Sequence, residues 1–382
     1  MMDLNQLQEL RALAYQPTLE AMRYWQRMAN KQYWTPDHYQ FAKSKALRLT
    51  SSDFPGATVG LAARLIGNDL RFSCPHADPV LAELQKNLVL HVLRINNRDG
   101  GVNIWQRLRR EVLTYGVAYV KACYNDEARF PIRLKNLDVF DTGVLYTDLG
   151  CTFAWTSYKE YEHEKEKADK DRLSEFCTIT EYYYLENDKV WMVEEEDGEL
   201  GEPEETKYAQ IPIIRFICED GEVDSMAAPV SILSGLEETW ARQCLSDSVA
   251  VTGMEQYYWP AVYAQSEGGG TIPDIVIRPG QIITNLPPKT KFDVIPGRPE
   301  VGLLQLIGEM NNRELSQRSF PPALFTGAGA ASSGYVFNTD ASLGAVRIAS
   351  IIQNLEDGLS NLGSLILCIA KKYNAGKLSL SY

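Results

Sequence analysis

The first 125 residues carry hydrophobic side chains at the spacing of amphipathic helices. Leucines recur at intervals of three from Leu4 to Leu13, and residues 81–96 (LAELQKNLVLHVLRIN) show a similar periodicity. A turn at 99–101 separates this stretch from a second helical one. From 116 to 124 the sequence GVAYVKACY changes to the alternation of a strand. The pattern therefore predicts a mostly helical N-terminal part that leads into a sheet.

Residues 130–225 change to short hydrophobic runs that are rich in β-branched and aromatic side chains and separated by polar turns. Such runs are typical of strands, and five of them stand out: IRLKNLDVFDT, CTFAWTSY, CTITEYYYL, KVWMVEE and IPIIRFIC. They predict an α+β unit with an antiparallel sheet or a small barrel. The acidic stretch 194–205 (EEEDGELGEPEE) is expected to be an exposed loop.

A third pattern follows Pro229 and alternates helices with short strands. Residues 231–254 contain no proline and predict one helix of about six turns. Short runs punctuated by Pro and Gly occupy 257–300 and predict small strands. A second helix is expected over 301–320, because Pro321 and Pro322 stop it.

The last part of the chain combines a segment of small residues with a long helix. Residues 326–340 (TGAGAASSGYVFNTD) begin with Gly, Ala and Ser and predict a loop. From about Leu343 to Tyr373, isoleucines and leucines fall on one broad face, which predicts a helix.

Length and composition bound the number of domains and the compartment. At 382 residues, the chain is expected to form two or three compact units. A hydrophobic content of 45% excludes wholesale disorder. No apolar run approaches the roughly 18 residues of a membrane-spanning helix, and the N-terminus lacks the apolar core of a secretion signal. The seven cysteines are scattered without a CxxC pair, which favours a reducing cytoplasm over a disulfide framework or zinc finger.

The net charge of −12 is unevenly distributed along the chain. Residues 1–125 carry 16 Lys and Arg against 10 Asp and Glu, whereas residues 126–225 carry 11 against 27. Binding to nucleic acid through its phosphates requires Lys and Arg that displace counterions. An acidic chain is therefore a poor candidate for gripping nucleic acid, although it suits a protein that nucleic acid must pass without sticking.

Candidate metal ligands are too dispersed to form a site. The four histidines lie in separate segments without the spacing of a metal-binding motif: His38, His76, His91 and His163. Asp138 and Asp141 would offer a pair of carboxylates, but a turn at the end of a strand uses Asp for its own backbone hydrogen bonds. We therefore expect no metal.

The sequence also lacks complete motifs for cofactor binding and for catalysis. Residues 327–332 (GAGAAS) half-match the dinucleotide fingerprint, which needs a preceding buried strand and a third glycine at the helix start. Here Pro321 and Pro322 precede the segment and polar residues follow it. The sequence contains neither a GxxxxGK[ST] phosphate loop nor a GxSxG elbow. The prediction is a protein that is not an enzyme and that has no cofactor.

The order of elements is the most informative feature of the sequence. Three segments carry it: APVSILSGLEETWARQCLSDSVA, IVIRPGQIITNLPP and ELSQRSFPPALFTGAGAASSGY. Together with the upstream WQRLRREVLTYGVAYVKA and DVFDTG, they resemble the portal proteins of tailed bacteriophages, which form head-tail connector rings. The resemblance extends over about residues 66–373 and rests on a pattern of elements rather than on chemically active residues.

The resemblance implies an α+β fold with a portal-like architecture: an α/β wing, a two-helix stem, a small β clip and a long C-terminal helix. The implied boundaries are the wing at 1–230, the first stem helix at 231–256, the clip at 257–300, the second stem helix at 301–322, the tunnel loop at 323–342 and the long helix at 343–382. Many members continue into a helical crown, whereas this sequence ends at Tyr382. Either the crown is absent or the sequence is truncated.

The resemblance also implies a function. A portal protein forms a homo-oligomeric ring, commonly of twelve subunits, at one capsid vertex of the virion, and it assembles in the host cytoplasm. Double-stranded DNA passes through its channel during packaging and ejection. The implied protein partners are the terminase large subunit, the head-tail adaptor and the major capsid protein, and no membrane is involved. Two alternatives stay open: a scaffolding or adaptor protein without a channel, and an enzyme whose site the motifs miss.

Basic residues in the clip are the first candidates for a functional site. Arg278, Lys289 and Lys291 lie in a segment of short strands and turns. They are expected at the narrow exposed end, where they contact the packaging motor or the tail adaptor. The alternative is that they only keep the loops soluble.

The tunnel loop is the second candidate. Its glycines, Gly327, Gly329 and Gly334, relax the backbone. The segment 326–340 is expected to project into the channel and tighten around DNA, with Tyr335, Phe337 and Asn338 at or near its tip. Alternatively, the two aromatic residues anchor the loop against the ring wall. Because the loop lacks Lys and Arg, any DNA retention should depend only weakly on salt.

Overall fold

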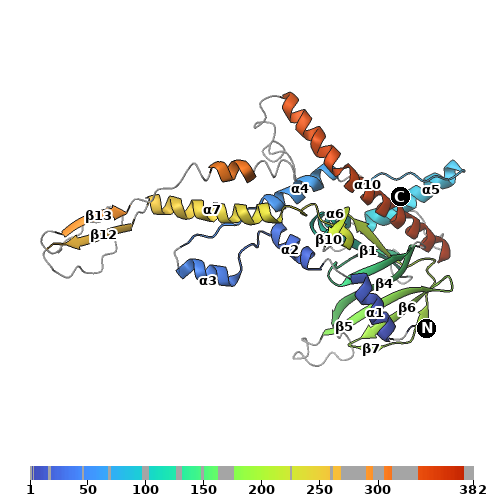
Figure 1. The fold of residues 1–382 in the computed structure, drawn as a ribbon. Coiled ribbons are helices and arrows are strands. Elements are labelled where there is room, and N and C mark those ends of the chain that lie inside the picture. Colours follow the sequence, from blue (N-terminus) through green and yellow to red (C-terminus); the bar gives the residue numbers. More distant parts are fainter. Residues whose placement is uncertain are drawn as a thin grey trace, which may run out of the picture. The chain divides into compact units, whose positions relative to one another are not determined.

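The computed structural model describes residues 2, 4–15, 19–44, 47–67, 70–96, 103–125, 131–147, 150–161, 176–223, 226–258, 261–267, 290–295, 305–311 and 334–373. Helices and antiparallel sheets occur together in these residues, which confirms the α+β class (Figure 1). The chain divides into two compact units. Unit 1 comprises Met1–Ala29, Gly56–Ser234 and Ala323–Tyr382, and unit 2 comprises Asn30–Pro55 and Gly235–Pro322. No helix in the described ranges is long and apolar enough to cross a membrane.

The N-terminal helices form where the hydrophobic periodicity predicts helical structure. Those of unit 1 are α1 (Leu4–Tyr15), α2 (Leu19–Ala29), α4 (Phe54–Ile66, whose first two residues belong to unit 2), α5 (Pro79–Asn96) and α6 (Ile104–Tyr115). The α2 helix buries Met22, Trp25 and Met28 at intervals of three. The side chain of Asn103 caps α6 by accepting a hydrogen bond from the backbone nitrogen of Gln106.

Gly116 ends α6 in the left-handed conformation, with φ of 82°. A Cβ atom at this position would lie 2.7 Å from the backbone carbon of Val230, so the close approach also requires glycine. This tight turn lets the chain pass directly from the helix into the first strand.

The first sheet of unit 1 has the antiparallel order β2-β1-β9. It consists of β1 (Val117–Tyr124), β2 (Ile132–Leu137) and β9 (Ile213–Ile217). The first four residues of β1 are all buried, so both faces of this sheet are covered. The long helix α10 (Gly334–Lys372) packs against β9 and β1, and α5 packs against α10 (Figure 1).

The second sheet of unit 1 has the order β3-β4-β5-β6-β7, with β8 also paired to β6. Its strands are β3 (Thr142–Thr147), β4 (Gly150–Tyr161), β5 (Phe176–Glu186), β6 (Lys189–Glu196), β7 (Glu199–Leu200) and β8 (Glu204–Glu205). Helix α1 packs against it, and Leu7 joins a core of aromatic side chains from β4 and β5 (Figure 1). The predicted antiparallel sheet is therefore present. A separate hairpin pairs β10 (Glu219–Val223) with β11 (Met226–Val230).

The acidic stretch 194–205 is mostly exposed, as its composition suggests, but it forms strands rather than a loop. It contains the end of β6 and all of β7 and β8. The reason is the Asp197-Gly198 dipeptide, whose φ angles of 46° and 94° form a two-residue turn between paired strands. Asn187 and Asp188 form the equivalent turn between β5 and β6. An Asp-Gly pair between strand-like runs is a sequence signal for a hairpin, and here it outweighs the acidic composition.

Unit 2 contains α3 (Pro36–Ser44), α7 (Glu237–Tyr258), β12 (Ala261–Ser266), β13 (Thr290–Ile295) and a helical segment at 305–311. Residues 47–53, which we call the strap, run along α7. The strap contacts a stripe of buried residues spaced four apart on the helix: Trp240, Cys244, Ser248 and Thr252. Half of this buried stripe is polar, namely Ser248 and Thr252, which explains why α7 is only weakly amphipathic.

Each of the two units is assembled from segments that are distant in the sequence. Residues 30–55, which were expected in the wing, group with α7, and α10 groups with the two sheets of unit 1. Hydrogen bonds between residues about 200 positions apart hold the strap on α7, and hydrophobic periodicity carries no information on such a pairing. The first predicted stem helix also begins later, at Glu237, because Ser231 forms a turn in which its hydroxyl accepts a hydrogen bond from Leu233.

Candidate functional site

The residues expected to form a clip include one two-stranded sheet in the described part of the chain. β12 and β13 pair antiparallel, with Gln265 opposite Lys291. Nζ of Lys291 lies 2.6 Å from Oε1 of Glu267, and the side chains are 75% and 52% exposed. Lys291 is therefore an accessible cation whose charge one exposed carboxylate partly offsets. Arg278 and Lys289 lie outside the described residues.

The tunnel-loop residues are divided between helix and undescribed chain. Gly334, Tyr335, Phe337 and Asn338 lie in the first turns of α10, so the prediction of a loop extending to 340 is wrong for them. The segment from 335 to 342 contains neither Gly nor Pro, and a helix already fixed by its packed C-terminal part extends at little cost. Gly327 and Gly329 lie outside the described residues. The long helix consequently begins nine residues before its expected start at Leu343.

Both helical segments of unit 2 that fall within the predicted stem expose large hydrophobic side chains. On α7, Leu245 and Val249 are exposed and lie one turn apart. In the helical segment 305–311, Leu306 and Met310 are exposed at the same spacing. Residues four apart share one face of a helix, so each segment presents an apolar stripe. Each stripe is therefore a candidate for contact with another protein surface.

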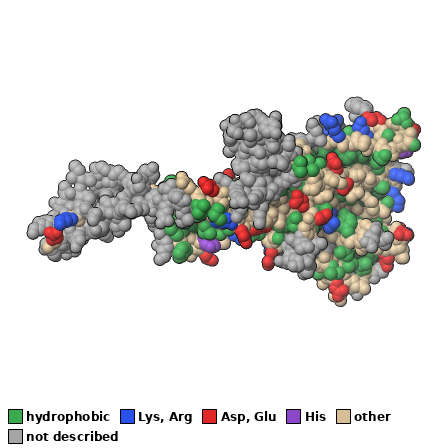
Figure 2. All heavy atoms as spheres, turned by 45° about the horizontal axis from the view of Figure 1, so that its top comes forward, with side chains coloured by type: hydrophobic (Ala, Val, Ile, Leu, Met, Phe, Trp, Pro, Cys, Tyr) green, Lys and Arg blue, Asp and Glu red, His purple; other side chains and the backbone are tan. Residues whose placement is uncertain are grey.

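Charged side chains of both signs lie on the face drawn in Figure 2. On the face drawn in Figure 2, described Lys and Arg side chains (blue) are interspersed with hydrophobic and acidic ones. Among the residues of β6 to β8, exposed Glu and Asp side chains predominate, and Lys189 pairs with Glu205 at 2.8 Å. A surface of this kind provides few cations to displace the counterions of DNA.

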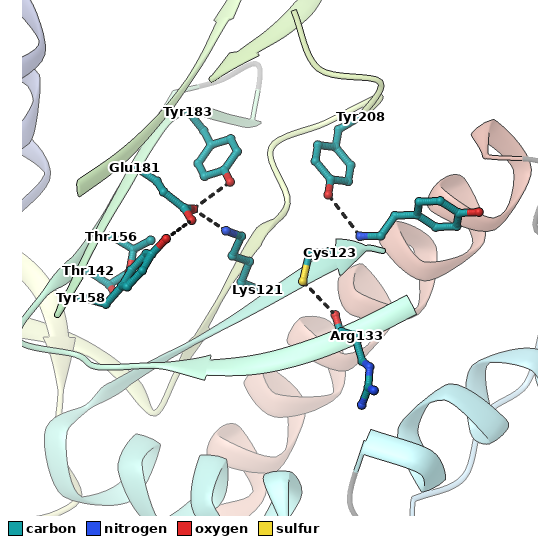
Figure 3. Close-up of polar contacts among 10 residues, drawn as sticks. Lys121, Cys123, Arg133, Thr142, Thr156, Tyr158, Glu181, Tyr183 and Tyr208 are labelled. Carbon is teal, nitrogen blue, oxygen red and sulfur yellow. Dashed lines mark hydrogen bonds and ion pairs between the residues drawn. The ribbon is translucent and has the colours of Figure 1, made fainter. Parts of the chain in front are cut away.

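Unit 1 contains a buried ion pair that the sequence did not reveal. Lys121 of β1 contacts Glu181 of β5, and the hydroxyls of Tyr183 and Tyr158 donate hydrogen bonds to Glu181 at 2.8 and 3.0 Å (Figure 3). Burial raises the pKa of Glu181, but the Lys121 ammonium and these hydrogen bonds outweigh it, so the pKa lies below its usual value. Each oxygen of the carboxylate is satisfied, which indicates a structural bond between the two sheets. A Glu within the aromatic run CTITEYYYL was the only sequence signal.

Three tyrosines hold the C-terminal end of α10 against the first sheet. The rings of Tyr124 and Tyr373 stack with centroids 4.1 Å apart, and the ring of Tyr208 lies 5.9 Å from that of Tyr373. The backbone nitrogen of Tyr124 donates a hydrogen bond to the Tyr208 hydroxyl (Figure 3). Burial raises the pKa of Tyr208 to about 12, so this hydroxyl stays protonated at neutral pH.

Three of the residues weighed as metal ligands make structural contacts, and His163 lies outside the described residues. Asp138 Oδ1 accepts a hydrogen bond from the backbone nitrogen of Phe140 at 2.9 Å, which is the turn that the sequence predicts. Nδ1 of His38 lies 2.6 Å from Oγ1 of Thr35, and Nδ1 of His76 accepts from the backbone of Asp78. Over the described ranges, no three His, Cys, Asp or Glu side chains are grouped so that they could hold a metal ion.

Comparisons with known proteins identify the fold but no sequence family. No family model matches this chain, and no curated protein matches it. A chain from the neck of an empty gene transfer agent particle, computed with C6 symmetry, has a TM-score of 0.50 and 11% identity, over 96% of this chain and 90% of that chain.

Two further solved structures are similar at a lower score. A chain from the virion of a native gene transfer agent particle has a TM-score of 0.49 and 12% identity, over 87% of both chains. A chain from the neck of a native particle, computed with C12 symmetry, has a TM-score of 0.45 and 12% identity, over 82% of this chain and 77% of that chain. The chain thus has a fold found in the neck of a gene transfer agent particle, with hardly any common sequence.

Proposed function

We propose that this chain is a portal protein, one subunit of a ring at a capsid vertex through which double-stranded DNA is packaged and ejected. The observation that carries the proposal is the fold similarity to a chain in a particle neck, which extends over 96% of this chain and nearly all of that one. The order of elements in the sequence resembles that of bacteriophage portal proteins. This resemblance supports the same role.

The exposed apolar stripes of unit 2 support a ring. Leu245 and Val249 on α7, and Leu306 and Met310 in the segment 305–311, would be costly to leave in water. Subunits that contact each other through two different surfaces close into a ring when the rotation between them closes. Contacts of this kind between neighbouring copies would bury the stripes. The similar neck chain was itself computed with C6 symmetry.

The charge of the chain supports passage of DNA rather than tight binding. The net charge of −12 is multiplied around a ring, so a duplex inside it would meet few cations and much acidic surface. The segment with Gly327 and Gly329 is the part of the predicted tunnel loop that remains a candidate for steric contact with DNA. We assign no catalytic activity and no cofactor to this function.

The clip residues are the proposed docking site for the terminase large subunit and the head-tail adaptor. Lys291 is exposed next to Glu267 at the end of the β12–β13 pair, so a partner could bind it without opening a core. Arg278 and Lys289 belong to the same sequence segment. The major capsid protein would contact other surfaces of the same ring.

The test is the oligomeric state of the purified chain. Size-exclusion chromatography with light scattering should give a closed multimer, and negative-stain images should show rings with a central hole. A stable monomer at micromolar concentration and physiological salt, both alone and with capsid protein, would contradict the proposal. Oligomers without a hole, or a small complex with another virion protein, would instead favour the scaffolding or adaptor alternative.

A further inference from the structure

The strap is attached to α7 by a ladder of hydrogen bonds with a regular spacing. The backbone nitrogen of Arg48 donates to Oγ1 of Thr252 at 3.0 Å. The backbone nitrogen of Thr50 donates to Oγ of Ser248 at 2.9 Å, and that of Ser52 donates to Sγ of Cys244 at 3.3 Å. From one of these hydrogen bonds, or rungs, to the next, the residue number increases by two in the strap and decreases by four in α7.

This spacing follows from backbone geometry. Two residues of an extended chain span about 6.4–6.8 Å, and four residues of an α-helix span about 6.0 Å. An extended segment that runs antiparallel to a helix therefore meets every fourth side chain with every second N–H group. The hydroxyls of Ser248 and Thr252 suit this contact, because each donates its own proton to the carbonyl four residues earlier, at 2.7 Å, and keeps a lone pair for the strap.

The line of acceptor residues on α7 (Cys244, Ser248 and Thr252) continues beyond the last residue that the strap contacts. It continues in the sequence to Gln256, so that Cys, Ser, Thr and Gln stand at four successive positions with a spacing of four. The rung at Cys244 is the weakest, because sulfur is a poor acceptor and burial raises the pKa of this thiol to about 11, which keeps it protonated.

We propose that the strap has two registers on α7, one helical turn apart. In the second register, Ser52 is bonded to Ser248 and Thr50 to Thr252, and Arg48 comes opposite position 256, where the sequence supplies a further acceptor residue, Gln256. The number of backbone rungs is unchanged, and the sulfur acceptor is exchanged for an oxygen. Elements that have two packed arrangements differing by one turn are a known basis of conformational switching.

Two indole rings favour the present register. Nε1 of Trp240 donates to the carbonyl of Ser52 at 3.0 Å, and Nε1 of Trp34 donates to the carbonyl of Thr50 at 2.8 Å. The ring of Tyr33 packs edge-on against Trp240 with centroids 5.1 Å apart. A shift by one turn removes the bond from Trp240, so the second register is the minor one, with a population of about 0.1–10%.

Cysteine crosslinking within the full-length chain tests the proposal. Thr50→Cys is combined with Ser248→Cys, Thr252→Cys or Val249→Cys in a chain that keeps Cys244, because the exchange of its sulfur for an oxygen acceptor is the gain that favours the shift. Mass spectrometry measures the rate at which each pair forms a disulfide under a mild oxidant. The pair 50–248 reports the present register and 50–252 the shifted one. The pair 50–249 is the matched control, because exposed Val249 lies next to Ser248 but about 100° away around the helix.

We expect the 50–252 disulfide to form about 10 to 1,000 times more slowly than 50–248, in proportion to the minor population, and still faster than the control. Gln256→Ala should slow 50–252 and leave 50–248 unchanged, because Gln256 is an acceptor only in the shifted register. A disulfide between Ser52→Cys and Ser248→Cys also reports the shifted register, and this pair leaves Thr252 unchanged. The proposal is overturned if neither shifted pair exceeds the control, or if Gln256→Ala has no effect on the shifted pairs. These contacts lie within unit 2, and the crosslinks are measured at a protein concentration too low for ring assembly, because Val249 belongs to the proposed ring contact.

Discussion

Gly358 of α10 lies so close to Phe216 of β9 that a Cβ atom at 358 would be 2.5 Å from Cδ1 of the ring. Phe216 is fully buried in a strand that pairs with β1, so its ring has no free space into which to move. The contact sets the distance between α10 and the first sheet. Glycine at 358 is thus a requirement of packing rather than of backbone conformation.

We expect Gly358→Ala to destabilise the protein by up to about 2 kcal/mol, since overpacking costs about 1–3 kcal/mol and the gain in helix propensity offsets about 1 kcal/mol of it. Chemical denaturation measures the change in the free energy of unfolding. Gly60→Ala in α4 is the matched control, because a Cβ atom there meets nothing within 4 Å and should be neutral or stabilising. Equal effects of the two substitutions would contradict the packing argument.

The buried ion pair predicts a loss of stability when its carboxylate is neutralised. Glu181→Gln leaves the ammonium of Lys121 buried without a counter-charge, and we expect a cost of about 3–5 kcal/mol. Denaturation at pH 7 measures it. Replacing both partners with apolar side chains, as Lys121→Met with Glu181→Leu, should be less destabilising than Glu181→Gln alone.

The same pair predicts a dependence on pH. The folded-state pKa of Glu181 lies below its ordinary value of 4.5, so its contribution to stability is complete above about pH 4.5. The contribution is lost as the pH falls through the lower, folded-state pKa. Wild type should therefore lose more free energy of unfolding than Glu181→Gln when the pH is lowered from 6 to 3. Parallel curves for the two proteins would show that Glu181 does not titrate in this way.

Reversing the charge of Lys291 should affect binding but not stability. Lys291→Glu breaks an exposed ion pair, which is worth about 0–1 kcal/mol, so melting and ring formation should be unchanged. If the proposed docking site is correct, affinity for the terminase or the adaptor should fall several-fold, as measured by a pull-down or interferometry. Lys189→Glu, which breaks an exposed pair with Glu205 in unit 1, is the control and should bind normally. Unchanged binding by Lys291→Glu together with Lys289→Glu would remove the clip proposal.

Charges on the α7 stripe should prevent assembly. Leu245→Glu with Val249→Glu places two carboxylates at an interface that would bury apolar side chains, and an unpaired buried charge is strongly unfavourable. We expect monomers or open fragments on size-exclusion chromatography, with an unchanged circular dichroism spectrum. Leu13→Glu alters a leucine on α1 of unit 1 that is at least as exposed, and it should leave rings intact. Intact rings in the double variant would show that the stripe is not an assembly contact.

The sequence alone determined the elements whose pattern is local. Leucines at helical spacing predicted α5 and α10, and β-branched and aromatic runs predicted the antiparallel strands, because 3.6-residue and two-residue periodicities are set by the backbone itself. The turn at Asp138 followed from the same local chemistry. The Asp197-Gly198 dipeptide also predicts a hairpin from the sequence, although the acidic composition of the stretch suggested a loop.

Only the tertiary structure decided which distant segments meet. The strap pairs with α7 through Thr50 and Ser248, and Lys121 pairs with Glu181, across separations that no periodicity encodes. The start of α10 at Gly334 was likewise decided by packing further along the helix, which made extension of the helix favourable against a loop-like composition. Most buried polar groups need hydrogen-bond partners, and for Thr50 and Lys121 those partners are supplied by the fold rather than by sequence neighbours.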